Sequence, residues 1–196
     1  MAKRLFDIVC AGLGLLILLP LLVVLALWIK WDSPGPVLFR QERVGRFGRP
    51  FHIHKFRSMR KDAPVVGPQI TVGDDTRITR SGRLLRMAKL DELPQLWDVL
   101  RGTMSLVGPR PEVPRYVALY TPEQRELVLS VRPGITDPAS LQFRNESEIL
   151  ACAADPEREY VEVILPIKLQ IAGDYVRRAS LRTDIGLIFA TLRRIF

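Results

Sequence analysis

Two adjacent carboxylates, Asp91 and Glu92, stand near the middle of the chain and are its best candidates for chemistry. Basic side chains surround them: three precede the pair at helical spacing, and one follows it in the rigid turn Gly-Pro-Arg-Pro. These four are Arg83, Arg86, Lys89 and Arg110. Cations attract a phosphate, and carboxylates are ligands for a hard divalent metal ion. The pattern therefore predicts chemistry on a phosphorylated substrate with a metal ion.

A structural role for Asp91 explains part of the same pattern. The apolar run 93–100 predicts a helix, and an Asp shortly before Leu-Pro is a favourable N-cap residue. A carboxylate at a helix N-terminus is held in its ionised form, which also suits a nucleophile or a metal ligand. Capping and catalysis are therefore compatible, and both stay open at this point.

Composition narrows the class of protein. The chain has 196 residues, enough for one domain with a hydrophobic core. Its net charge of +8, from 29 Lys and Arg against 21 Asp and Glu, favours anionic partners such as a nucleotide, a nucleic acid or an acidic membrane surface. Cys10 and Cys152 are far apart and in no metal-binding spacing, which fits free thiols. The sequence contains none of the familiar glycine-rich phosphate loops.

An uncharged N-terminal run, residues 8–29, is about 33 Å long as a helix, enough to cross the core of a bilayer. A signal peptide is disfavoured because the run is too long and no cleavage site follows it. Pro20 lies in mid-run and would kink a helix, and basic residues flank both ends, among them Lys3, Arg4 and Lys30. Because positive charges favour the cytoplasmic side, a helix that enters and leaves by one face satisfies both features. A spanning helix with a tolerated proline is the open alternative.

Two short β-strands are predicted after this segment, at residues 37–39 and 51–56, with a basic glycine-rich loop between them. His52 and His54 share one face of the second strand. We expect that face to be solvated, because no third zinc ligand is nearby in the sequence.

Further basic features also suit an anionic partner. Lys55 and Arg57 point to the same side of the second strand and form either an anion grip or an ordinary surface pair. Residues 78–89 and 181–196 are both amphipathic and basic, and such helices lie well in the headgroup plane of a membrane. Helices that pack on a protein core give the same pattern, so both interpretations stay open for these segments.

Four ordered motifs resemble the bacterial sugar transferases, the monotopic phosphoglycosyl transferases that begin glycoconjugate assembly. The motifs are Lys55-Phe56-Arg57-Ser58-Met59, Leu90-Asp91-Glu92-Leu93-Pro94-Gln95-Leu96, Gly102-x-Met104-Ser105-Leu106-Val107-Gly108-Pro109-Arg110-Pro111 and Val131-Arg132-Pro133-Gly134-Ile135-Thr136. The resemblance runs over the whole chain. It implies a mainly helical α+β fold with a small antiparallel β element and interfacial amphipathic helices. Residues 1–32 would form a re-entrant membrane helix broken at Pro20, and residues 33–196 a catalytic domain on the cytoplasmic face of the bacterial inner membrane.

The resemblance also implies a reaction. Such enzymes transfer a phosphosugar from a nucleotide diphosphate sugar, here expected to be a UDP-sugar, to a polyprenol phosphate such as undecaprenyl phosphate, with Mg²⁺ as cofactor and UMP as the second product. Asp91 would be the nucleophile that carries the phosphosugar, and Glu92 would bind Mg²⁺ together with Asp91. The basic residues expected at the phosphates are Arg86, Arg110, Lys55, Arg57 and Arg132. Membrane lipids and downstream glycosyltransferases of exopolysaccharide assembly are the further partners it implies.

The chain departs from the family pattern in two places. Leu19 stands before Pro20 where many members have serine, so a hydroxyl group that assists the kink is absent. After Pro-Gly-Ile-Thr, where many members continue with Gly-Trp-Ala-Gln, this chain has Asp137-Pro138-Ala139-Ser140, followed by Leu141-Gln142-Phe143-Arg144, which leaves the selectivity for sugar or nucleotide open.

Two other classes of function compete with this interpretation. A non-catalytic membrane-surface binding module explains the charge, but it does not explain a carboxylate pair among arginines. A membrane-tethered nucleic-acid binder is disfavoured, because three tryptophans and scattered arginines give no stacking platform or recognition helix. We therefore expect no nucleic-acid partner.

Overall fold

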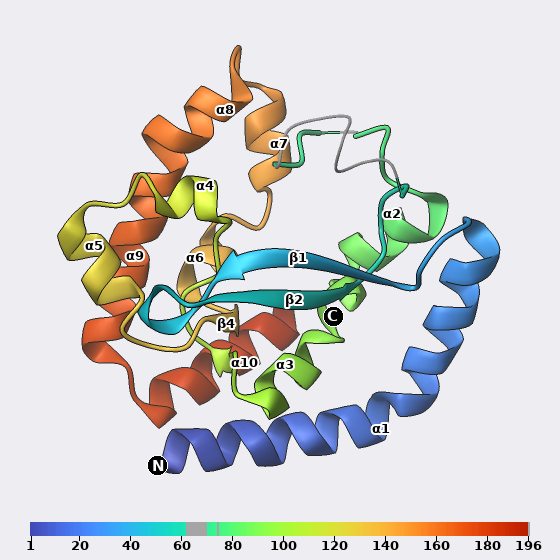
Figure 1. Ribbon diagram of the computed structural model, residues 1–196, viewed down its shortest axis with the longest axis horizontal. Coiled ribbons are helices and arrows are strands. Elements are labelled where there is room, and N and C mark those ends of the chain that lie inside the picture. Colours follow the sequence, from blue (N-terminus) through green and yellow to red (C-terminus); the bar gives the residue numbers. More distant parts are fainter. Residues whose placement is uncertain (62–69, 74, 196) are drawn as a thin grey trace.

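The computed structural model describes residues 1–61, 70–73 and 75–195 and is a mainly helical α+β fold, as predicted (Figure 1). The helices are α1 (Ala2–Asp32), α2 (Arg80–Met87), α3 (Gln95–Arg101), α4 (Pro114–Val117), α5 (Pro122–Val128), α6 (Pro138–Gln142), α7 (Glu146–Ala151), α8 (Pro156–Glu159), α9 (Leu165–Arg178) and α10 (Leu181–Ile195). The strands are β1 (Leu38–Val44), β2 (Pro50–Phe56), β3 (Ser105–Val107) and β4 (Gly134–Thr136). Short 3₁₀ turns, η1 (Arg46–Gly48) and η2 (Leu90–Glu92), and a π-helical turn, η3 (Tyr160–Ile164), complete the elements.

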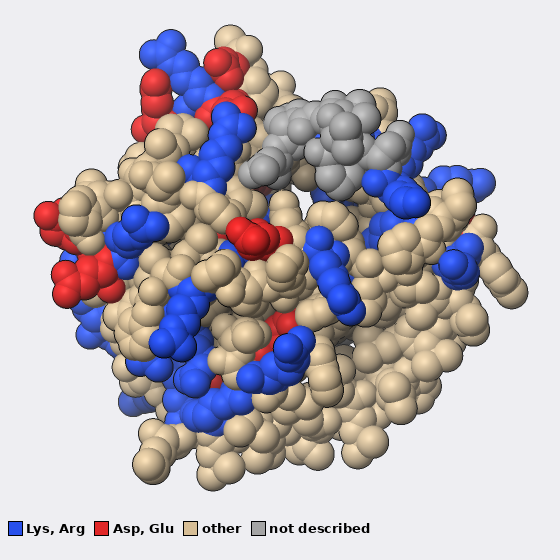
Figure 2. Space-filling view, in the orientation of Figure 1, with Lys and Arg blue, Asp and Glu red and all other residues tan. Residues whose placement is uncertain are grey.

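Helix α1 is bent into two arms that run along two sides of the molecule (Figure 1). Pro20 lies within the helix, and a proline removes a backbone hydrogen bond and clashes with the preceding turn, which accounts for a bend. By length and composition α1 could cross a membrane. Where the two arms lie, the surface in Figure 2 is almost free of charged side chains.

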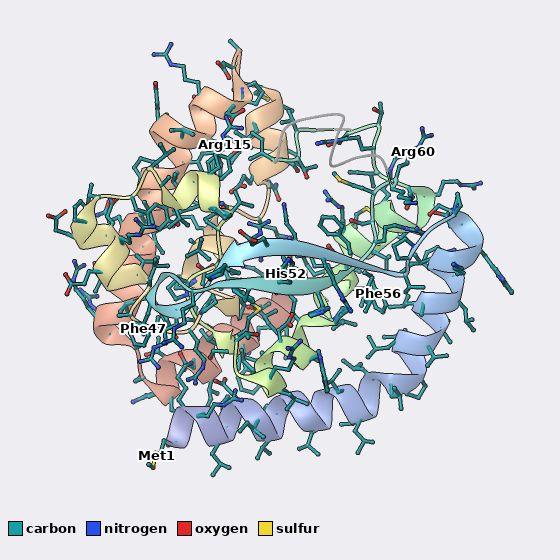
Figure 3. All side chains as sticks on the ribbon, viewed as in Figure 1. Met1, Phe47, His52, Phe56, Arg60 and Arg115 are labelled. Atoms are coloured by element: carbon teal, nitrogen blue, oxygen red, sulfur yellow. The ribbon has the colours of Figure 1, made fainter. Side chains whose placement is uncertain are left out.

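Both arms of α1 pack against the same domain. The first arm buries Ala11 against Val99 of α3 and Met104. The second arm buries Ile29 in a cluster with Phe56 of β2, which lies between the hairpin and this arm (Figure 3). The large side chains on the rest of α1 stay exposed, so the helix presents an apolar outer surface to its surroundings.

Polar contacts fix the N-terminal end of α1. The Arg4 guanidinium donates to the carbonyl oxygens of Val99 and Leu100, at 2.6 and 3.0 Å, at the end of α3. Asp7 is buried and accepts from Ser105 Oγ at 2.9 Å. Lys3 donates to the buried carboxylate of Asp184 on α10. The basic residues that precede the apolar run therefore bind the domain directly, in addition to any effect they have on topology.

Strands β1 and β2 form an antiparallel hairpin that crosses the middle of the molecule (Figure 1). Strand β1 extends to Val44, five residues beyond the predicted end, so the connecting loop is shorter than expected. His52 is exposed, as predicted, but His54 is buried and its Nδ1 lies 2.7 Å from Asp98 Oδ1. The expectation that both histidines are solvated is wrong for His54, because α3 covers that part of the strand.

A second pair of strands, β3 and β4, is parallel and was not predicted from the sequence. Gly108 and Gly134 make this pairing possible, because a Cβ atom on Gly134 would lie only 2.1 Å from the Gly108 backbone nitrogen. Just beyond β4, Asp137 accepts from the backbone nitrogen of Arg110 at 3.1 Å and from that of Ser140 at 2.7 Å. The pair therefore fixes the turn that carries Arg110 beside α6.

A separate hydrophobic core joins the helices on the side opposite the second arm of α1 (Figure 1). Its buried side chains come from α4, α5, α7, η3 and α9, and include Tyr116, Leu150, Tyr160 and Ile164. The elements α8, η3 and α9 follow one another without a break. This helical core also supports the segment from β4 to α6, because α6 packs on α9.

Candidate active site

The turn η2 buries both carboxylates. Lys89 adopts a left-handed backbone conformation, with φ 55°, and separates α2 from η2. Asp91 and Glu92 follow at once and are 7% and 8% exposed. Helix α3 begins at Gln95, with Pro94 at its N-cap position. The interpretation of Asp91 as the N-cap of this helix is therefore wrong, and its burial needs another reason.

Glu92 is the centre of an ion-pair network built from three separate elements. Lys55 Nζ, from the end of β2, donates to Glu92 Oε1 at 2.8 Å. The Arg110 guanidinium binds in bidentate fashion, Nη2 to Oε1 and Nη1 to Oε2, the latter at 3.2 Å. Two of the predicted basic residues thus meet the predicted acid.

These contacts control the ionisation of Glu92. Burial alone would raise its pKa, but the charges of Arg110 and Lys55 and their hydrogen bonds outweigh burial, so the pKa lies well below its usual range. The Glu92 charge in turn raises the pKa of Arg110 against the effect of burial. Burial lowers the pKa of Lys55, and Glu92 opposes that shift only in part.

Asp91 has the opposite environment. Among the described residues no hydrogen bond to its carboxylate is found, although Lys55, Arg86 and Lys89 are close enough to act on it electrostatically. Burial, and next the charge of Glu92, raise the pKa of Asp91 above its usual value. The direction of this shift is opposite to the one expected for a carboxylate at a helix N-terminus. Two adjacent carboxyl groups are therefore given different acidities, as is common for catalytic pairs.

Arg86 is held in a fixed position near Asp91. Its Nε donates to Ser58 Oγ at 2.9 Å, and its Nη1 donates to Thr71 Oγ1 at 3.0 Å. Burial lowers the pKa of Arg86, while the charge of Asp91 opposes that shift. A guanidinium anchored on two hydroxyl groups can meet a phosphate without first reorganising.

The structure places Arg57 and Arg132 away from the carboxylate pair. Arg57 turns to the end of α1 and donates to the carbonyl oxygens of Pro34 and Ser33, at 2.8 and 2.7 Å. Gly35 makes room for it, because a Cβ there would lie 2.1 Å from Arg57 Nη1. Arg132 Nε donates to the Gly102 carbonyl oxygen at 2.8 Å. Neither of the two alternatives for Lys55 and Arg57 holds, because Arg57 is buried and its guanidinium binds carbonyl groups just beyond the end of α1.

A half-open cavity of about 160 Å³ adjoins Glu92 and Arg110. Its walls come from the start of α3, strand β4, helix α6 and the last turns of α10. The sequence analysis did not predict that residues of α6 and α10 line a cavity at this site. The one feature that could have indicated it was the unusual segment 137–144, which supplies Ser140, Leu141 and Arg144 to the cavity.

The carboxylate pair fits Mg²⁺ only as a site shared with a substrate. Among residues 1–61, 70–73 and 75–195, no three His, Cys, Asp or Glu side chains are grouped to hold a metal ion. Mg²⁺, however, commonly uses one or two carboxylates together with substrate phosphates and water. Asp91 offers a carboxylate without a hydrogen bond from the described residues, and Glu92 has lone pairs beyond those that bind Arg110 and Lys55.

Neutralising the two carboxylates should change stability in opposite directions. Asp91→Asn removes a charge that its surroundings disfavour, so the Tm at neutral pH should rise. Glu92→Gln removes the shared partner of Lys55 and Arg110, so the Tm should fall. Hydrogen bonds to charged groups are each worth about 1.5–3 kcal/mol, and roughly 2–4 °C accompanies each kcal/mol in a chain of this size.

The Tm changes expected for Asp91→Asn and Glu92→Gln should both become smaller at acidic pH. The pKa of Asp91 is higher in the folded state than in the unfolded state. Its ionised form therefore destabilises the folded protein fully at pH values above the folded-state pKa, and this cost disappears at pH values below the unfolded-state pKa. The folded-state pKa of Glu92 is depressed, so its contribution is present at neutral pH and is lost as pH falls through that pKa. Thermal unfolding in detergent at several pH values measures both, with exposed Glu126→Gln as control. Shifts of the same sign at neutral pH would contradict the assignment.

Comparison with known proteins places the same segments in one family. The family described as bacterial sugar transferase matches residues 1–196. A UDP-N-acetylgalactosamine-undecaprenyl-phosphate N-acetylgalactosaminephosphotransferase of Aeromonas hydrophila is 38% identical over 98% of this chain and 43% of its own length. A UDP-glucose:undecaprenyl-phosphate glucose-1-phosphate transferase of Xanthomonas campestris pv. campestris is 41% identical over 99% of this chain and 38% of its own length.

Another UDP-glucose:undecaprenyl-phosphate glucose-1-phosphate transferase, from Caulobacter vibrioides, is 41% identical over 97% of this chain and 68% of its own length. The chain thus spans less than half of the first two relatives and about two thirds of the third. The names of these relatives share the lipid phosphate but differ in the sugar.

Proposed function

This chain belongs to the bacterial sugar transferase family, and from that premise we propose that it moves a phosphosugar from a UDP-sugar to undecaprenyl phosphate and releases UMP. The similar proteins are named for this kind of transfer. The observation that carries the proposal is the buried pair Asp91 and Glu92, in which one carboxyl group is left free of hydrogen bonds from the described residues and the other holds two cations.

In the first half-reaction an oxygen of the Asp91 carboxylate attacks the phosphorus that bears the sugar. A carboxyl–phosphate bond forms while the bond from that phosphorus to the oxygen of UMP breaks, and UMP leaves with the electron pair. The raised pKa of Asp91 makes its ionised form more basic and hence more nucleophilic than a solvated carboxylate. Arg86, which is close to Asp91, and Arg110, which binds Glu92, would stabilise charge on the phosphoryl oxygens.

In the second half-reaction a phosphate oxygen of the lipid attacks the same phosphorus. The new diphosphate bond forms, and the carboxyl–phosphate bond breaks to return the Asp91 carboxylate. Donor and product both contain a diphosphate linkage, so the exchange is close to thermoneutral. The mixed anhydride on Asp91 keeps the phosphoryl group activated between the two steps.

Mg²⁺ belongs to this proposal as a cofactor held by Glu92 and Asp91 together with the phosphates of the donor. When bound, it would neutralise the diphosphate and improve UMP as a leaving group. Lys55 and Arg110 keep Glu92 ionised, which keeps it available as a ligand.

The membrane part of the proposal concerns α1. Its exposed apolar surface would lie in the lipid, with both ends on the cytoplasmic face of the inner membrane and the bend at mid-depth. The domain contacts of both arms support this placement, because they keep both ends of the helix at one domain. The lipid-linked product would then be presented on the same face to the glycosyltransferases that extend it.

The direct test is release of UMP from a UDP-sugar by the purified chain with Mg²⁺ and undecaprenyl phosphate. A panel of UDP-sugars identifies the donor. We expect UMP to appear in equal amount to the lipid-linked phosphosugar. Absence of UMP with every donor would favour the alternative function, a non-catalytic module that binds the membrane surface.

The re-entrant topology predicts that the N-terminus is never exposed to the periplasm. We would place a unique cysteine at Ala2 in a Cys10→Ser, Cys152→Ser background and treat intact cells with a membrane-impermeant maleimide. No labelling is expected until the cells are opened, because Lys3 and Arg4 bind the catalytic domain. Labelling of intact cells would show a spanning helix. A cysteine at exposed Ser180, on the catalytic domain, is the control for the cytoplasmic side.

A further inference from the structure

The cavity beside Glu92 and Arg110 has a mostly apolar interior. Its walls include Leu93 and Leu96 from the start of α3, Ile135 from β4 and Leu141 from α6. None of these four side chains takes part in the ion-pair network. The cavity therefore continues the site from charged groups into an apolar space of about 160 Å³.

One hydroxyl group of the lining, Ser140 Oγ, is buried without a hydrogen bond from the described residues, whereas the two threonines of the lining are already paired. Thr136 Oγ1 and Thr191 Oγ1 lie 2.7 Å apart and bond to each other, and Thr191 Oγ1 also donates to the Leu187 carbonyl oxygen. A sugar or a nucleobase buried here would lose hydrogen bonds to water that these groups cannot replace. An apolar group meets no such cost.

Apart from Ser140 and the Glu92 carboxylate, the remaining polar lining is cationic. Lys89, Arg144 and Arg194 line the cavity together with Arg110. The Arg194 guanidinium also donates to the Leu141 carbonyl oxygen, which joins the end of α10 to α6. An apolar space bordered by cations suits a ligand with a hydrocarbon body and a phosphate head.

The cavity also lies against the proposed membrane helix. A Cβ atom on Gly14 of α1 would lie 3.4 Å from Leu96 Cδ1, so this wall residue packs directly on α1. On the opposite wall, α10 carries exposed apolar side chains, among them Phe189 and Leu192, next to the lining residues Thr191 and Arg194. Leu96 thus connects the cavity wall to α1, and α10 carries exposed apolar side chains close in sequence to two lining residues.

We propose that this cavity binds the isoprene unit next to the phosphate of the lipid acceptor, with α6 and α10 as the elements that recognise it. An apolar cavity of about 150 Å³ holds a ring of six carbons, so 160 Å³ accommodates one five-carbon unit. The phosphate then points to Arg110 and the carboxylate pair, where its oxygen attacks the phosphosugar on Asp91. The inference rests on the proposed function and assigns the unusual segment 137–144 to the acceptor.

The two half-reactions separate this inference from the function on which it rests. Leu141→Gln places an amide in the cavity at nearly constant volume, and Ile135→Thr does the same with a hydroxyl group from another wall. Both variants should form the phosphosugar adduct from donor alone at a rate within about twofold of the unchanged protein. Their KM for undecaprenyl phosphate should rise about tenfold, which corresponds to 1.4 kcal/mol.

Two further variants make the result specific. Leu141→Met keeps the apolar volume and should restore the KM, whereas Leu119→Gln, at an exposed leucine after α4, should leave it unchanged. The Tm of each variant shows that it is folded, and Ile135→Thr serves should Leu141→Gln be unstable. An unchanged KM in both polar variants would overturn the inference. So would loss of adduct formation in them, since it would place the donor in the cavity. If the unchanged protein forms no adduct, the proposed function itself fails.

Discussion

Replacing Asp91 by Asn is expected to abolish turnover and to prevent any covalent adduct with the donor. The amide has neither the charge nor the free lone pairs of the carboxylate that attacks phosphorus. The site should otherwise stay intact, because no hydrogen bond from the described residues depends on the Asp91 oxygens and the two cations bound to Glu92 remain in place. Loss of the nucleophile alone should therefore reduce the rate to the level of the uncatalysed reaction.

Intact-protein mass spectrometry with a UDP-sugar and Mg²⁺, but no lipid, measures the adduct directly. The unchanged protein should gain the mass of one phosphosugar, and Asp91→Asn should gain nothing. Glu92→Gln should still form the adduct, more slowly and with a higher requirement for Mg²⁺. Asp174→Asn is the control, since its carboxylate makes only a surface ion pair with Arg177. An adduct that persists in Asp91→Asn would remove Asp91 from its role.

The sequence predicted the residues of the site better than their environment. Lys55 and Arg110 bind Glu92, next to Asp91, so residues from three separate motifs lie together, while their roles stay a prediction. The raised pKa of Asp91 was not predictable, since it follows from burial in a turn and from the charge of Glu92 rather than from an N-cap position. Burial of this kind is a property of the assembled fold.

The environments of two individual side chains, Arg57 and His54, could not be predicted from the sequence either. Strand alternation placed Arg57 beside Lys55, but the chain leaves β2 at Phe56 and the free carbonyl groups at the end of α1 attract the guanidinium. His54 was expected in solvent, but α3 brings Asp98 to its ring. Both partners are distant in sequence, so local patterns contain no signal for them.

The features of the fold likewise differ in how far the sequence could predict them. The mainly helical class follows from the family resemblance, and the hairpin and the amphipathic helix from Leu181 follow from local patterns in the sequence. The parallel pair of β3 and β4 joins segments about 30 residues apart and rests on the close contact of Gly108 with Gly134. Two three-residue strands are too short to show a period, and so the pairing that positions Arg110 was not foreseen.

Arg110→Lys should lower the rate of adduct formation about a hundredfold, although it preserves the charge. The guanidinium binds both oxygens of Glu92 and can turn one face to the phosphoryl group, whereas an ammonium ion offers a single point of contact. The loss of one preorganised donor to transition-state charge typically costs a factor of about 10² to 10³. Single-turnover release of UMP measures the effect, and exposed Arg193→Lys on α10 is the matched control, expected within about twofold. Arg86→Lys should lower the rate of adduct formation to a similar extent, because the Arg86 guanidinium is also held in place by two hydroxyl groups. Equal losses at all three positions would mean that the overall positive charge, and not the geometry of the two arginines beside the carboxylate pair, stabilises the transferring phosphate.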